Sequence, residues 1–160
     1  MTESRIEARI RELGYELPVA PAPVAAYVPA VTSGSYVYTS GQLPFVDGAL
    51  PETGKVSDSD AEGFVTPENA KKYAGICLLN ALAAVKSVIG DLDRVQRVVK
   101  VVGFVASEVN FTAQPAVING ASELLGEIFG EAGQHARSAV GVPVLPLDSP
   151  VEVEIIVEYV

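Results

Sequence analysis

Arg137 is the residue whose type and position most clearly suggest ligand chemistry. It begins an apolar segment, residues 137–142, in a chain that has 11 Lys and Arg against 20 Asp and Glu. A guanidinium fixed at the start of a strand can hold a small carboxylate through two parallel hydrogen bonds. The same side chain could instead form a structural ion pair with Glu152 or Glu154 of the following strand. The residues alone leave both interpretations open.

Two further side chains could do chemistry. His135 is the only histidine, and an imidazole can act as an acid or a base near neutral pH, but a lone histidine in a loop is more often solvated. Cys77, the only cysteine, falls on the apolar stripe of a predicted helix. That position favours a place in the core over a role as nucleophile. A single cysteine also excludes a disulfide within the chain.

Common cofactor and metal motifs are missing from the sequence. The glycines form neither a G-x-G-x-x-G pattern nor a P-loop, and one His and one Cys are too few for a zinc site. The sequence therefore predicts chemistry without a metal or a cofactor. The net charge of −9 argues against nucleic acid as a partner, because it repels a phosphate backbone.

The size and composition of the chain favour one domain that associates with copies of itself. The 160 residues fit a single domain over 1–160, and 49% of them are hydrophobic while 19% are charged. Such a chain has more apolar surface than a small monomer needs, so an oligomer is expected. The first residues lack the pattern of a signal peptide, and prolines between residues 18 and 44 rule out a membrane helix there. We expect a cytoplasmic protein without a membrane span.

Apolar periodicity, capping residues and turn residues predict the elements that must position these side chains. In chain order they are a helix over 3–13, strands over 25–31 and 36–41, a helix over 67–89, a strand over 94–106, a helix over 113–129, and strands over 138–142 and 151–160. The helix over 67–89 is preceded by a long polar loop. The first twenty residues form an N-terminal helix and an extended segment.

The order of these elements predicts an α+β sandwich, in which a mixed β-sheet carries two long helices on one face. The valine-rich strand, 94–106, is expected at the centre of the sheet and buried on both faces. The last strand alternates, with Val151 and Val153 on one face and Glu152 and Glu154 on the other. The second face of the sheet is left uncovered, so another subunit is expected to cover it.

Several blocks of sequence resemble one known family. They are YTSGQLP at 38–44, VKVVGFV at 99–105, and ARSAV at 136–140 followed by LP at 145–146 and VEVE at 151–154. Their order is typical of the Rid family of reactive-intermediate deaminases, also called YjgF or L-PSP proteins, and the resemblance covers residues 24–160. It implies a chorismate-mutase-like fold and a homotrimer.

The resemblance also implies a site between subunits. In that site Arg137 binds the substrate carboxylate, Glu152 holds the attacking water, and Tyr27 is contributed by the neighbouring subunit. The other residues that the resemblance places in the pocket are Ser40, Gly41, Asn119 of the second long helix, and Ala139, whose backbone amide binds the ligand.

The chain departs from the family pattern at several positions. Ala139 stands where many members have a cysteine, which excludes thiol chemistry there. His135 stands where a proline often precedes the arginine by two residues. The N-terminal segment, 1–20, and the loop over 47–65 are enlarged, which is typical of a longer, chorismate-mutase-like subgroup that carries an endoribonuclease label.

Three functional hypotheses follow. The first is an enzyme that hydrolyses reactive 2-imino or enamine acids to 2-keto acids and ammonia, with Arg137 as the carboxylate clamp and Glu152 as the water holder. An iminium carbon is already electrophilic, so no cofactor is needed. The second is a trimeric protein that binds or senses a small carboxylate. The third is an endoribonuclease, against which the acidic charge and the lack of a basic stripe argue.

Overall fold

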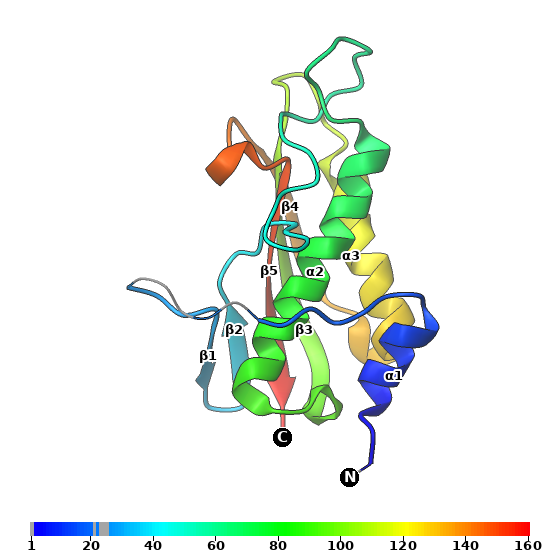
Figure 1. Cartoon of the computed structure of the whole chain (residues 1–160), viewed down its shortest axis with the longest axis vertical. Coiled ribbons are helices and arrows are strands. Elements are labelled where there is room, and N and C mark those ends of the chain that lie inside the picture. The colour runs from blue at the N-terminus through cyan, green and yellow to red at the C-terminus, as the bar shows by residue number, and fades with distance from the viewer. Residues whose placement is uncertain (1, 21, 23–25) are drawn as a thin grey trace.

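The computed structural model describes residues 2–20, 22 and 26–160 of the chain. The described α-helices are α1 (Arg5–Glu12), α2 (Pro67–Ile89) and α3 (Gln114–Phe129), and short 3-10 turns are η1 (Leu92–Arg94), η2 (Gly130–Gly133) and η3 (Pro146–Asp148) (Figure 1). The described strands are β1 (Ala30–Ser33), β2 (Tyr36–Thr39), β3 (Val95–Ala106), β4 (Ala136–Val142) and β5 (Val151–Tyr159).

The strands form one mixed sheet in the order β1-β2-β5-β3-β4. β3 and β4 are parallel, and every other neighbouring pair is antiparallel. Val101 lies opposite Arg137 in the parallel pair, and Phe104 lies opposite both Val140 and Glu152. β4 is an edge strand, with no strand of the described chain on its outer side. These registers fix the face of the sheet on which each side chain lies.

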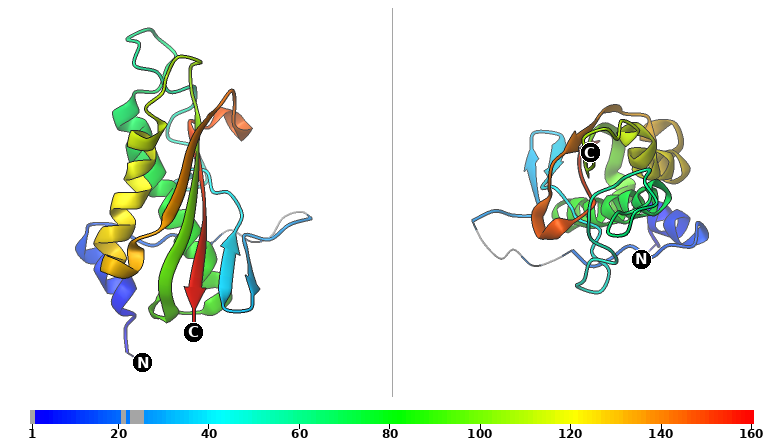
Figure 2. Two further views of the ribbon diagram at one scale, coloured as in Figure 1. Left: turned by 180° about the vertical axis from the view of Figure 1, so that it is seen from behind. Right: turned by 90° about the horizontal axis from the view of Figure 1, so that it is seen from above.

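Both long helices pack on one face of the sheet (Figure 2). Alternate residues of β5, among them Val151, Val153 and Ile155, are buried beneath the helices, whereas Glu152 and Glu154 lie on the opposite face and are partly exposed. None of the described helices covers that second face. The predicted α+β sandwich is therefore confirmed.

The helix α2 begins and ends at the residues that its sequence predicts. The side chain of Thr66 accepts a hydrogen bond from the backbone N–H of Asn69 at 3.2 Å, Pro67 occupies the first turn, and Gly90 ends the helix with φ at 87°. By length and composition alone α2 could cross a membrane, but more than half of its most apolar stretch is buried inside the molecule. Cys77 is fully buried in this stretch, which confirms its predicted core position.

Two expectations about the strands are wrong in detail. β5, not β3, is the middle strand of the sheet, and only one face of β3 is buried in the chain, because the helices cover one face alone. The first hairpin is shorter than predicted: residues 26–29 are not in a strand, and residue 25 lies outside the described residues. The hairpin itself is confirmed, with Ser33 paired to Tyr36 across the turn.

Asp93 docks the N-terminal helix onto the domain. Its carboxylate accepts hydrogen bonds from the Ser4 hydroxyl (3.1 Å) and from the backbone N–H groups of Arg5 (2.9 Å) and Ile6 (2.8 Å). Burial disfavours the charged carboxylate, but these hydrogen bonds outweigh that effect and lower the pKa of Asp93. Ile10 then packs into the core without any exposed surface.

The enlarged loop, residues 47–65, is tied to the rest of the molecule. Val56 and Val65 are fully buried, and the Val56 N–H donates to the carbonyl of Ala106 at 2.7 Å. The Tyr73 hydroxyl of α2 donates to Glu52 at 2.8 Å. Burial first, and then Glu52, raise the pKa of Tyr73 to about 12. The loop is therefore a fixed part of the fold.

Candidate functional site

Arg137 lies on the helix-covered face of the edge strand β4. It pairs in register with buried Val101, and its Nη1 donates to the Asn119 Oδ1 at 2.7 Å and to the Ser122 Oγ at 3.2 Å, both on α3. The remaining N–H groups of its guanidinium have no hydrogen-bond partner among the described residues. A planar fork held on one side in this way can present its other N–H groups to a carboxylate.

The structural ion pair considered for Arg137 is wrong. β3 separates β4 from β5, so Glu152 and Glu154 are not on a neighbouring strand. Both glutamates also lie on the face of the sheet opposite to Arg137. Among the residues that the structure describes, no carboxylate forms a salt bridge with this arginine.

His135 supports Arg137 through Ser122. Its Nδ1 lies 2.6 Å from the carbonyl oxygen of Gly133, and its Nε2 lies 2.8 Å from the Ser122 Oγ. A carbonyl oxygen can only accept, so Nδ1 donates to Gly133, and Nε2 shares a hydrogen bond with the Ser122 hydroxyl. The serine oxygen also accepts from Arg137. The expectation of a solvated loop histidine is therefore wrong, because both ring nitrogens are bonded.

Glu152 lies on the other face, packed against a glycine. Two hydrogen bonds between the backbones of Gln42 and Val153, of 2.8 and 3.0 Å, bring residues 40–42 alongside β5. A Cβ added to Gly41 would stand 2.7 Å from the Glu152 Oε1, so only glycine leaves room for the carboxylate. Burial first, and then the charge of Glu154, raise the pKa of Glu152.

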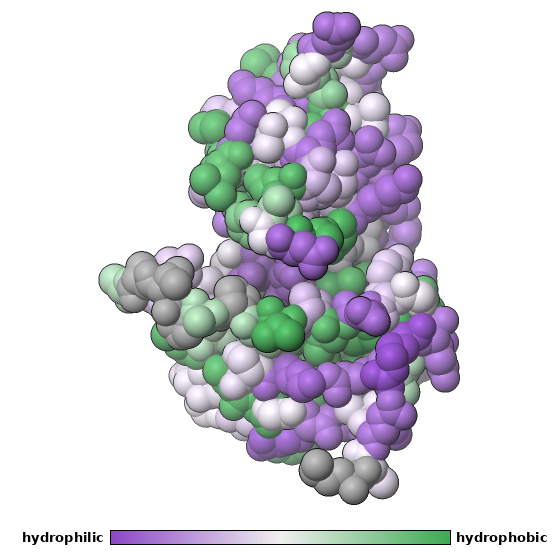
Figure 3. Space-filling model, in the orientation of Figure 1, coloured by the Kyte–Doolittle hydropathy of each residue, from purple (hydrophilic) through white to green (hydrophobic). Residues whose placement is uncertain are grey.

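A cavity of about 390 Å³ opens beside Glu152. Its lining includes Tyr27, Gly41, Leu43, Phe45, Leu147 and Glu152. Ser40 fixes the neighbouring backbone, because its hydroxyl donates to the carbonyl of Val28 at 2.7 Å. Hydrophobic surface gathers on the side of the molecule where η3 lies (Figure 3).

The predicted site residues thus form two clusters in one chain. The arginine cluster is Arg137, Asn119 and Ala139, and the glutamate cluster is Glu152, Tyr27, Ser40 and Gly41. Through Phe104 of β3, Glu152 is in register with Val140, which lies three residues after Arg137 on β4. Glu152 is therefore about 10 Å from Arg137 along the strand direction and, two strands away, about 10 Å across the sheet, and it lies on the opposite face. One chain therefore cannot present both charged groups to one small molecule.

This grouping corrects the role expected for Tyr27. The resemblance implied that Tyr27 joins Arg137 and Glu152 from a neighbouring subunit, but in the chain it lines the same cavity as Glu152. Arg137 is the residue that stands apart. Ala139 lies two residues after Arg137 on the same face of β4.

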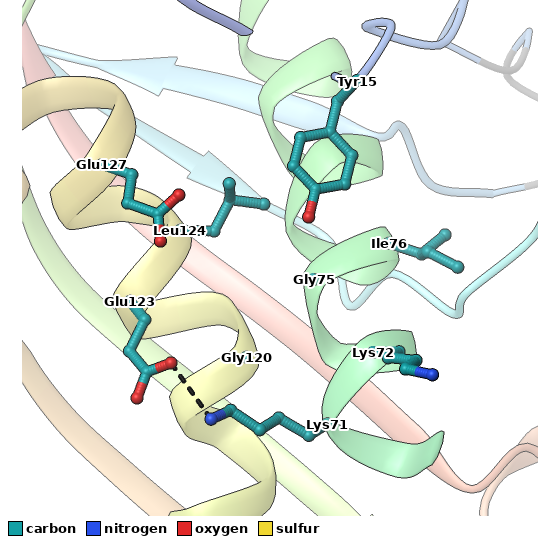
Figure 4. A pocket seen from close by; sticks show the side chains of 9 residues that line it. All are labelled: Tyr15, Lys71, Lys72, Gly75, Ile76, Gly120, Glu123, Leu124 and Glu127. Atoms are coloured by element: carbon teal, nitrogen blue, oxygen red, sulfur yellow. Dashed lines mark ion pairs between the residues drawn. The ribbon is translucent and has the colours of Figure 1, made fainter. Parts of the chain in front are cut away.

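A separate groove of about 470 Å³ lies between α2 and α3 on the outside of the molecule (Figure 4). The helices approach closely here, since a Cβ on Gly120 would stand 1.9 Å from the carbonyl oxygen of Lys71. Lys71 already pairs with Glu123 at 3.1 Å, and Tyr15 lies at the other end of the groove. The groove contains none of the predicted site residues, so we assign it no part in the chemistry.

Comparison with known proteins decides the family. A family model described as "YjgF/chorismate_mutase-like, putative endoribonuclease" matches residues 7–159. This chain belongs to the YjgF family. Its resemblance to Rid, YjgF and L-PSP proteins is confirmed, and the match spans all the blocks on which that resemblance rests.

Relatives with similar length match almost the whole chain. Protein TCP17 of Trypanosoma cruzi is 42% identical over 99% of this chain and 96% of its own length. The crystal structure of Atu1372 from Agrobacterium tumefaciens is 44% identical, with a TM-score of 0.88 over 98% of this chain and 93% of that one. TdcF of E. coli is 26% identical, with a TM-score of 0.62 over 88% of this chain and 94% of that one.

Two residues beside these clusters were missed in the sequence. Ser122 lies three residues after Asn119, on the same face of α3, so the helical spacing could have indicated it. Leu147 lines the cavity beside Glu152 with a backbone conformation that is rare for leucine. Nothing in the sequence around Leu147 signals that conformation.

Proposed function

We propose that this YjgF-family protein hydrolyses 2-imino and enamine acids to 2-keto acids and ammonia in clefts between the subunits of a homotrimer. The observation that carries the proposal is the division of the charged residues between two faces of the sheet. Arg137 and Glu152 can act on one substrate only if they come from two different chains. A shared site of this kind makes association a condition of activity.

The uncovered face of the sheet supports association. It carries Tyr38 and Val140, which are 42% and 44% exposed, together with partly exposed Phe104 and Ile156. Burial of this apolar face by a second and a third copy would stabilise the assembly. The same contact would bring the edge strand β4 of one chain near the glutamate cluster of its neighbour.

The arginine cluster supports a small carboxylate as the ligand. Asn119 and Ser122 fix one nitrogen of Arg137, and the other N–H groups can bind a carboxylate in a bidentate manner. The backbone amide of Ala139 is the proposed additional donor. The E. coli relative TdcF has been crystallised with bound serine, an amino acid that also carries a carboxylate.

The glutamate cluster supplies the proposed base. Glu152 holds a water, whose oxygen attacks the imine carbon while its proton passes to the carboxylate. That proton then moves to the nitrogen, which gives a carbinolamine. A second transfer, of the carbinolamine hydroxyl proton through Glu152 to the nitrogen, lets the carbon–nitrogen bond break, so that ammonia leaves as the carbonyl forms. A raised pKa makes Glu152 a stronger base than an ordinary glutamate, which favours this role.

A trapping experiment tests the proposal. An imine is generated in situ by oxidation of an amino acid, and its capture by semicarbazide is followed with and without the protein. The proposed activity predicts that the protein reduces the yield of semicarbazone and increases that of free keto acid. An unchanged yield, with a keto acid still bound, would instead favour the carboxylate-binding hypothesis.

A further inference from the structure

The cavity beside Glu152 is mostly apolar. Its lining includes Leu43, Phe45, Leu147 and Tyr27, and Glu152 is its only charged residue among those described. A volume of about 390 Å³ exceeds what a carboxylate and one water need. The space that remains is suited to an apolar side chain of the substrate.

Leu147 is held in this cavity at a conformational cost. Its backbone is left-handed, with φ at 58° and ψ at 21°, and Asp148 follows with φ at 59°. Residues with a Cβ rarely adopt this conformation, and two in succession are rarer still. The leucine side chain is 69% exposed, so packing within the chain does not explain why it is held there.

The enlarged loop maintains this strained turn. The Gly54 N–H donates to the carbonyl of Asp148 at 2.9 Å, and the Gly54 backbone, with φ at 119°, is one that glycine favours. Leu145 and Ser149 on either side of the turn are buried. The turn is thus fixed at both ends and held by the loop, and it places Leu147 in the lining of the cavity.

We infer that Leu147 contacts the side chain of the substrate and selects imino acids with large apolar side chains, such as those derived from leucine or phenylalanine. This inference rests on the proposed function, because it assigns the part of the substrate that lies beyond the carboxylate and the imine carbon. Binding against an apolar wall is favoured when a large side chain such as that of leucine is removed from water. The methyl group of an alanine-derived imine contributes much less binding free energy.

Kinetics with a series of imines test the inference. Imines are generated in situ from leucine, phenylalanine and alanine, and kcat/KM is compared for the parent and for Leu147→Ser. We expect the parent to prefer the leucine-derived imine, and the variant to lose about 10-fold on it while losing less than about 2-fold on the alanine-derived imine. Val144→Ser is the control, since Val144 is 65% exposed on the same connection but does not line the cavity.

A binding measurement separates this inference from the proposed function. The affinities of the parent and of Leu147→Ser for 4-methyl-2-oxopentanoate and for pyruvate are measured by calorimetry, which needs no turnover. A preference for the larger keto acid that Leu147→Ser abolishes supports the inference even if no imine is hydrolysed. Equal affinities in the parent, or an equal loss for both keto acids in the variant, would overturn it.

Discussion

At the scale of single residues, the guanidinium of Arg137 is hydrogen-bonded through Nη1, and its other N–H groups have no partner among the described residues. Its contacts with Asn119 and Ser122 fix the guanidinium without neutralising it. Arg137→Ala should therefore abolish keto acid binding and imine turnover while the chain still folds, because loss of one partner of a desolvated charge pair costs about 2–5 kcal/mol, or roughly 30- to 4,000-fold. Arg137→Lys should restore little, since lysine lacks the planar fork. Calorimetry measures keto acid binding, and urea unfolding measures whether the variants fold. Turnover by Arg137→Ala at the rate of the parent would contradict the role of Arg137 in binding the carboxylate.

Ser122 should have a smaller effect that depends on its oxygen. Ser122→Ala removes an acceptor from Arg137 and should weaken keto acid binding by about 2- to 10-fold, the range of one hydrogen bond. Ser122→Thr keeps the hydroxyl and should restore most of the affinity. The same loss in both variants would indicate that side-chain volume at this position, and not the hydrogen bond, controls Arg137.

Glu152 is tested by removing its charge while its size is kept. Glu152→Gln should lower kcat on the order of 10²-fold with keto acid affinity nearly preserved, because the amide cannot accept the proton of the water. Glu154→Gln and Glu158→Gln are matched controls on the same face of β5 and should retain turnover at neutral pH. Equal, small effects at all three positions would remove the water-holding role.

The raised pKa of Glu152 predicts a pH profile. The base works as a carboxylate, so kcat/KM should fall on the acid side as pH drops through a pKa above that of an ordinary glutamate. Burial is the larger cause of that shift and the charge of Glu154 the second. Glu154→Gln removes the second cause and should move the acid limb to lower pH. An acid limb in the parent at the pH of an ordinary glutamate would contradict the assignment of Glu152 as the titrating base.

At the scale of elements, the N-terminal helix depends on Asp93. Asp93→Asn keeps the size of the side chain but weakens its hydrogen bonds to the start of α1, which should cost about 1–2 kcal/mol of unfolding free energy, as for other helix caps. Since the folded-state pKa of Asp93 is lowered, its stabilisation is present above the unfolded pKa and is lost as pH falls through the folded one. Urea unfolding near neutral pH measures the loss of unfolding free energy in Asp93→Asn. The control is Asp58→Asn, at an exposed position of the loop over 47–65, and equal stabilities of the two variants would contradict the capping role of Asp93.

Local signals predicted most elements but not their arrangement. Thr66 and Gly90 mark both ends of α2, and alternation assigns the faces of β5. The order of strands depends on long-range pairing, so the sequence did not reveal that β3 separates Arg137 from Glu152. The sequence blocks that resemble the YjgF family identified most of the proposed site residues, but not the faces of the sheet on which these residues lie. The hydrogen bond between Ser122 and His135 joins α3 to the connection that follows it, and no periodicity in the sequence encodes it.

At the scale of the whole molecule, a site shared by two chains requires association. A trimer predicts a mass in light scattering of three times the 16.7 kDa of one chain, at micromolar concentration. The apolar side chains on the uncovered face, among them Tyr38 and Val140, provide the physical reason. A mass near that of one chain would remove both the assembly and the shared site.

Subunit mixing tests most directly whether each site is built from two chains. Arg137→Ala and Glu152→Gln proteins, each strongly impaired alone, are unfolded together in equal amounts and refolded, and imine turnover is measured. If Arg137 and Glu152 meet across a subunit boundary, about a quarter of the boundaries in random trimers combine an intact arginine with an intact glutamate, so about a quarter of the parent activity should return. If both residues serve the same site from one chain, no mixed trimer contains an intact site. Activity that stays at the level of the separate variants would contradict a site built from two chains.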